Sequence, residues 1–200
     1  MKRIKVQDKI QEVIQTFPKG SIFFAKDFLE HGNVESIRKA LARLTNKEFI
    51  VRLAHGIYLY PKIDEVFGVL FPGTENIAQA IARRDNIKLA TSGAIARNML
   101  GLCTQVPTKA VYLTDGSTRL VKIGRITIKF KHTTSKNLAA KGNISGLAIQ
   151  ALKMIGKDKV NKKIIAKIED VLQHEKKENI LHDAKLAPVW ISNTLIQAIR

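Results

Sequence analysis

The stretch NVESIRKALARLTNKEFIVRLAHGIYLYP, residues 33–61, decides the fold of the first third of the chain. Asn33 is a favoured N-cap residue, and apolar residues recur after it at helical spacing. The apolar stripe comprises Val34, Ile37, Leu41 and Leu44, and the opposite face comprises Glu35, Ser36, Lys39, Ala42, Arg43 and Asn46. The stretch therefore predicts an amphipathic helix that packs by one face and leaves the other free.

A β-hairpin is predicted directly after this helix. Residues 49–53 are rich in β-branched and aromatic side chains, Ala54-His55-Gly56 supplies a turn, and residues 57–60 return to Pro61. Arg52 and His55 would lie near the tip of this hairpin.

The order of elements around this stretch is typical of a winged helix-turn-helix. A helix at 2–16, a short strand at 22–24 and a second helix at 25–31 precede the helix and hairpin, and the short strand is expected to pair with the hairpin. Ser36, Lys39 and Arg43 are spaced i, i+3 and i+7 on the outer face, and the small Ala42 between them would allow close approach to base edges. An amphipathic helix with a merely solvated charged face is the alternative.

The remaining sequence predicts a junction at 61–73 and a mixed α/β domain at 74–200, so the whole chain is expected to be α+β with a DNA-binding domain at 1–60. Strands at 110–114, 119–123 and 125–131 suggest a small antiparallel meander, and helices are expected at 144–155, at 159–172 and after Pro188. In the last strand Ile126, Ile128 and Phe130 would be buried. The alternating basic residues, with their neighbours, form a second candidate functional face: Arg119, Lys122, Arg125, Lys129 and Lys131.

The charge balance favours a polyanionic partner. The 200 residues include 34 Lys and Arg against 17 Asp and Glu, a formal net charge of +17. No apolar run approaches the roughly 18 residues of a membrane span, and charges interrupt the N-terminus where a signal peptide needs apolar residues. We therefore expect a cytoplasmic protein with no membrane partner.

The sequence offers little catalytic chemistry. Between Asn86 and Lys157 the only acidic residue is Asp115, whereas a nuclease core needs a second carboxylate for its metal. No G-x-x-x-x-G-K-[ST] phosphate loop and no clustered Cys and His residues occur. We expect neither an enzyme nor a cofactor or metal site.

Several motifs together resemble the AbiEi family of antitoxins from type IV toxin-antitoxin systems. These are IRKALARL, the hairpin RLAHGIYLYP, the later run TSGAIARNMLGLCTQVPTKAVYLTDGSTR, and RITIKFK. The resemblance covers essentially the whole chain and implies a repressor of its own operon that acts through the N-terminal domain. It also implies that the C-terminal domain, residues 74–200, is an antitoxin domain that antagonises a nucleotidyltransferase-like toxin without a stable complex. It places the DNA-binding role on Ser36, Lys39, Arg43, Arg52 and His55.

Two alternatives remain open at this level. An RNA-binding or general nucleic-acid-binding protein would use the basic second domain, where residues 61–141 hold 13 basic and 5 acidic groups. A direct toxin-binding inhibitor would offer the same basic face to an acidic partner.

Overall fold

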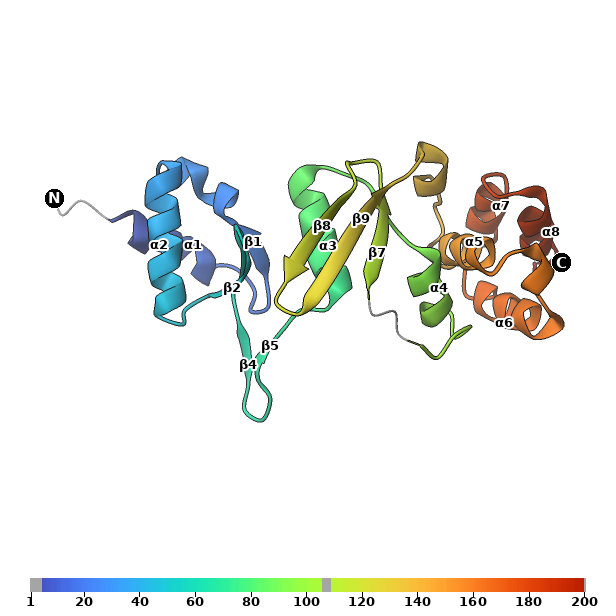
Figure 1. Ribbon diagram of the computed structural model, residues 1–200, viewed down its shortest axis with the longest axis horizontal. Coiled ribbons are helices and arrows are strands. Elements are labelled where there is room, and N and C mark those ends of the chain that lie inside the picture. Colours follow the sequence, from blue (N-terminus) through green and yellow to red (C-terminus); the bar gives the residue numbers. More distant parts are fainter. Residues whose placement is uncertain (1–4, 106–108, 200) are drawn as a thin grey trace. The chain divides into compact units, whose positions relative to one another are not determined.

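The computed structural model describes residues 5–105 and 109–199, and its helices and small sheets have the expected α+β character (Figure 1). The chain divides into two compact units, one running to Asp85 with residues 122–126 added, and the other made of residues 86–121 and 127–200. This division lies later in the chain than the predicted junction at 61–73. The functional roles of the predicted domains on either side of that junction stay predictions. Within the described ranges, no helix has the length and apolar run that crossing a bilayer requires.

The first unit begins with the expected order of helices and strands. It runs α1 (Val6–Gln15), β1 (Ile22–Phe24), the 3-10 helix η1 (Ala25–His31), α2 (Val34–Asn46), β2 (Val51–Ala54) and β3 (Ile57–Leu59). The strands form an antiparallel sheet in the order β1-β3-β2, with Phe23 opposite Tyr58 and Val51 opposite Leu59. The short strand before the second helix therefore pairs with the hairpin, as the sequence indicated.

Aromatic rings and one face of α2 build the core of this unit. Phe23 stacks on Tyr58, with ring centroids 5.8 Å apart, and forms a T-shaped pair with Phe28, with ring centroids 5.6 Å apart. From α2, the buried side chains are Ile37, Ala40, Leu41 and Leu44. Val34 was expected in this apolar stripe, but it is the first residue of α2 and is 71% exposed.

A second hairpin and a helix complete the first unit. Strands β4 (Lys62–Asp64) and β5 (Gly68–Leu70) pair only with each other among the described strands. Helix α3 (Thr74–Asp85) contacts β1, and the Arg84 guanidinium lies 4.7 Å from the centroid of the Phe24 ring. Most of the stretch predicted as a junction, residues 61–73, therefore forms a regular hairpin.

A mixed four-stranded sheet belongs mainly to the second unit, with only residues 122–126 around its β8–β9 turn grouped with the first, and the predicted antiparallel meander is wrong. Its strands are β6 (Leu89–Thr91), β7 (Ala110–Thr114), β8 (Arg119–Ile123) and β9 (Ile126–His132), in the order β6-β7-β9-β8. Strand β9 lies between β7 and β8 and pairs with β7 in parallel, with Tyr112 opposite Phe130. Ile126, predicted to be buried, is 43% exposed.

The connection between β7 and β8 explains this topology. Thr118 Oγ1 accepts a hydrogen bond from the backbone N–H of His132 at 3.0 Å, and the His132 ring lies 3.1 Å from the Gly116 carbonyl oxygen. Asp115 Oδ1 accepts from the N–H of Lys88 at 2.8 Å. These bonds carry the chain around the end of β9, so β8 reaches the far side of that strand.

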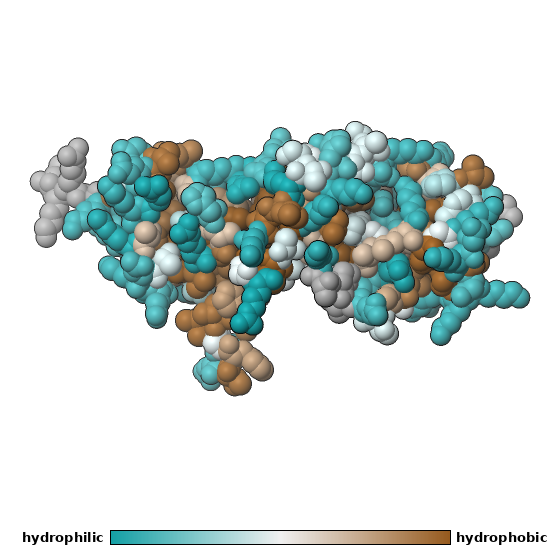
Figure 2. Space-filling view, in the orientation of Figure 1, coloured by the Kyte–Doolittle hydropathy of each residue, from teal (hydrophilic) through white to brown (hydrophobic). Residues whose placement is uncertain are grey.

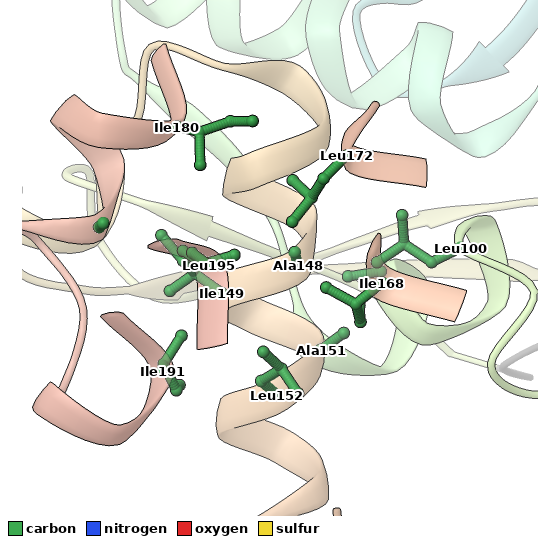
Figure 3. Close-up of a cluster of buried hydrophobic side chains, with 12 residues drawn as sticks. Leu100, Ala148, Ile149, Ala151, Leu152, Ile168, Leu172, Ile180, Ile191 and Leu195 are labelled. Atoms are coloured by element: carbon green, nitrogen blue, oxygen red, sulfur yellow. The ribbon is translucent and has the colours of Figure 1, made fainter. Parts of the chain in front are cut away.

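Helices form the other part of the second unit. They are α4 (Gly93–Met99), η2 (Ser135–Leu138), α5 (Asn143–Ile155), η3 (Lys157–Lys159), α6 (Lys162–Leu172), α7 (Lys177–Ala184) and α8 (Val189–Gln197). Helix α5 contacts α4, α6, α7 and α8, and Figure 3 shows its Ala148, Ile149 and Leu152 among the apolar side chains of these neighbours. Gly93 permits the close approach of α4, because a Cβ there would lie 2.5 Å from the Gln150 carbonyl oxygen.

Carboxylates from distant segments cap the start of α5. The buried Asp183 accepts hydrogen bonds from the N–H groups of Lys141 and Gly142 at 2.8 and 2.9 Å, and from Ser145 Oγ at 2.6 Å. Glu175 accepts from the N–H of Ile144 at 2.9 Å. Since the first N–H groups of a helix have no partner within it, Asp183 and Glu175 tie α5 to the C-terminal helices.

Replacing Asp183 by Asn is expected to lower the free energy of unfolding of the second unit by about 2 kcal/mol, because an amide NH₂ would then face a hydrogen-bond donor. Unfolding in urea followed by the fluorescence of Trp190, which packs against this helical core, measures the change. Asp158→Asn, at an exposed position, is the matched control. Equal stability of the two variants would contradict the capping role.

The same carboxylate predicts a pH dependence. Burial raises the pKa of Asp183, but hydrogen bonds with His182, Ser145 and the backbone outweigh it, so the pKa lies below the ordinary value. A lowered folded-state pKa stabilises the fold above the unfolded pKa, and this stabilisation is lost as pH falls through the folded pKa. The stability difference between the wild type and Asp183→Asn should therefore shrink in acid.

Candidate nucleic-acid interface

The start of α2 is fixed by its own polar side chains. Asn33 Oδ1 accepts a hydrogen bond from the N–H of Ser36 at 2.8 Å, and Ser36 Oγ donates to the Asn33 carbonyl oxygen at 2.8 Å. Ser36 is half-buried, and its hydroxyl proton is already donated at the helix start rather than to a ligand. Asn33 is thus the N-cap that the sequence indicated.

The outer face of α2 is less positive than its lysine and arginine content suggests. Lys39 Nζ lies 2.7 Å from a carboxylate oxygen of Glu35, one turn earlier, and the two side chains are 62% and 66% exposed. Arg43 is exposed on the same helix. An exposed pair of this kind adds little stability, but it offsets the charge of Lys39.

A groove of about 260 Å³ separates α2 from the β2–β3 hairpin. Residues spaced three or four apart on α2 form one wall, and the hairpin forms most of the other. The α2 wall consists of Val34, Arg38, Ala42, Thr45 and Asn46, and the hairpin contributes Arg52, His55, Gly56 and Tyr58. The groove therefore joins an arginine of the helix to an arginine and a histidine of the hairpin.

Arg52 and His55 lie together at the hairpin turn. An Nη atom of Arg52 is 3.3 Å from Nδ1 of His55, and its Nε donates to the Ala54 carbonyl oxygen at 3.4 Å. The register shifts between Arg52 and Ala54, and Gly56 closes the turn with a φ of 69°. Both basic side chains line the groove.

The structure brings only part of the sequence-predicted site together. Arg52 and His55 line the groove, whereas Ser36, Lys39 and Arg43 do not. At 100° per residue, Arg43 lies about 140° around α2 from Arg38. Arg38 was missed by the sequence reasoning, although its spacing of four from Ala42, a residue of the predicted outer face, was a signal that it lies near that face.

The five residues of the second candidate face do not lie on one face of the sheet. Lys129 and Lys131 are exposed at alternate positions of β9, while the Arg119 guanidinium lies 5.1 Å from the ring centroid of the buried Phe130, on the opposite side. Lys122 on β8 and Arg125 in the following turn are exposed. Within β9 the basic surface therefore reduces to Lys129 and Lys131.

A protein-family model described as "Family of unknown function (DUF6088)" matches residues 9–180 of the chain. No curated protein matches the chain. Among solved structures, the crystal structure of RV2827C protein from Mycobacterium tuberculosis is similar with a TM-score of 0.49 and 12% sequence identity, over 98% of this chain and 82% of that one.

Removing the N-cap is expected to destabilise α2, which forms one wall of the groove. Asn33→Ala is expected to lower the free energy of unfolding of the first unit by about 1 kcal/mol, because the N–H of Ser36 loses its acceptor. Hydrogen exchange of the α2 amides measures the change. Asn46→Ala, an exposed asparagine at the other end of the same helix, is the control, and an equal effect there would contradict the capping role of Asn33.

Proposed function

The chain belongs to DUF6088, a family of unknown function, and we propose that it is a DNA-binding transcriptional autorepressor whose first unit acts as a winged helix. The observation that carries the proposal is the groove between α2 and the β2–β3 hairpin, where Arg38, Arg52 and His55 converge. Arginine is the residue best suited to bidentate recognition of phosphates and of guanine.

The proposed binding mode follows from how α2 packs. Because one face of α2 is buried, the opposite face is turned to solvent. The small Ala42 on that face allows the helix backbone to approach base edges in a major groove. Arg38 and Arg43 flank Ala42 and read bases or hold phosphates on either side. The Arg52 and His55 side chains contact the DNA backbone beside the helix.

The second part of the proposal is that the protein is an antitoxin. Its support is the resemblance of the whole chain to AbiEi antitoxins of type IV toxin-antitoxin systems. Under this proposal the protein acts in the cytoplasm, antagonises a nucleotidyltransferase-like toxin encoded beside it, and forms no stable complex with that toxin. It needs neither a cofactor nor an enzymatic activity of its own.

A general nucleic-acid-binding function is the second candidate. The exposed pair Lys129 and Lys131 on β9 favours it, since a β-sheet surface with basic side chains suits a single strand or an RNA. This candidate differs from the first in placing the affinity in the second unit.

The full chain is expected to bind the DNA upstream of its own gene more tightly than random duplex of equal length. If about six phosphates are neutralised, the logarithm of the binding constant should fall with the logarithm of salt concentration with a slope of roughly −5. Fluorescence anisotropy at several salt concentrations measures this slope. A slope near zero would refute DNA binding, and a preference for RNA would favour the second candidate.

Single alanine substitutions should separate the two candidates. Arg38→Ala and Arg43→Ala are each expected to weaken binding to the upstream DNA by about 1 to 3 kcal/mol if the guanidinium contacts a base. Lys129→Ala removes an equal charge from the second unit and should leave this affinity nearly unchanged. An equal loss on random DNA would reassign either arginine to phosphate contact, and a larger loss for Lys129→Ala would favour the second candidate.

Neutralisation of the toxin should not depend on DNA binding. Co-expression with the toxin gene expected beside it should restore growth for the wild type and for Arg43→Ala alike, because the resemblance gives the antitoxin role to residues 74–200, whereas Arg43 lies in α2. Colony counts under induced toxin expression measure this. Failure of the wild type to restore growth would refute the antitoxin proposal and leave the repressor proposal standing.

A further inference from the structure

The β4–β5 hairpin exposes more large apolar side chains than a solvated hairpin needs. Val66 is 83% exposed, Phe67 79%, Ile63 72% and Phe71 67%. Figure 2 shows apolar residues gathered on this hairpin, which projects away from the helices of the first unit in Figure 1. Contiguous apolar surface of this kind marks a site of association.

The hairpin also has two open edges. Its strands pair only with each other among the strands of residues 5–105 and 109–199, so each presents unpaired backbone groups on its outer side. A two-stranded hairpin by itself is only marginally stable in water. Its turn is held locally, because Asp64 Oδ1 accepts hydrogen bonds from the N–H groups of Val66 and Phe67 at 2.9 and 3.0 Å.

The outer edge of β4 is complementary to itself. If two copies of β4 run antiparallel about a two-fold axis through Ile63, each Lys62 lies directly opposite the Asp64 of the other copy. The two Ile63 side chains then face each other on the other side of the new sheet, since successive residues of a strand alternate. One symmetric register therefore gives two ion pairs and one apolar contact.

We propose that two copies of this chain associate through β4, joining their β4–β5 hairpins into a four-stranded intermolecular sheet centred on Ile63. This inference is independent of DNA binding and goes beyond it, because it assigns an assembly state.

The local charge of the hairpin favours a second copy of the chain, rather than a nucleic acid, as the partner that binds the edge of β4. The chain carries +17 overall, whereas residues 61–73 hold two acidic groups, Asp64 and Glu65, against Lys62 alone. An apolar, slightly acidic hairpin repels a polyanion. Two strongly basic copies meet with least repulsion where the local charge is not positive.

Cysteine cross-linking tests the register. In the full-length Cys103→Ser chain, Ile63→Cys should form a disulfide-linked dimer under mild oxidation, because the two Cβ atoms face each other across the axis. Lys62→Cys is the matched control: its two copies would lie roughly 8 Å apart, given about 3.4 Å per residue and about 5 Å between strands, which is beyond disulfide reach. Equal cross-linking of both variants, or none of either, would overturn the proposal.

Charge reversal tests the ion pairs without a cross-link. Sedimentation velocity of the wild type should show a concentration-dependent monomer–dimer equilibrium without DNA. Lys62→Glu, which sets two carboxylates opposite each other, is expected to raise the dimer dissociation constant about tenfold. Lys159→Glu makes the same charge change at an exposed position elsewhere and should not weaken the dimer. A wild type that stays monomeric at all concentrations, or equal effects of both variants, would refute self-association through β4.

Discussion

The one-sided burial of α2 is the constraint on which the first unit depends. Ile37, Leu41 and Leu44 are at most 1% exposed and pack with α1 and the aromatic cluster around Phe23, so the helix cannot rotate without opening the core. This fixes which residues meet the hairpin and which meet solvent. The composition of the groove is therefore a consequence of core packing, and its basic residues occupy positions that the core leaves free.

Local signals in the sequence were enough to predict the elements of the first unit. Asn33 was identifiable as an N-cap from residue type alone, and Gly56 with its neighbours identified the β2–β3 turn. The pairing of residues 22–24 with the hairpin followed from the order of elements. Arg52 and His55 were placed correctly near the hairpin tip, because the turn was predicted at residues 54–56 and lies at residues 55–56.

The features that could not be predicted from the sequence depend on contacts between distant segments of the chain. Apolar and basic side chains alternate along β9 whether the neighbouring strand is parallel or antiparallel. This alternation therefore could not predict that β9 lies between β7 and β8. Helix α7 was missed because only Ile180 and Ala184 mark its buried face, and the capping role of Asp183 exists only once α5 lies beside it. Arg38 was missed because helical spacing shows which residues share a side, but not which side the hairpin occupies.

The parallel pairing of β7 and β9 has a consequence for the order in which the protein folds. Strands β8 and β9 follow each other across a two-residue turn and can meet early, whereas β7 and β9 join only after the chain has closed around the 115–118 loop. Contacts of larger sequence separation form more slowly, because the entropy of loop closure is lost before the contact stabilises anything. The α1–α2–hairpin region, built from neighbouring elements, should therefore reach its native form while the central sheet of the second unit is still assembling.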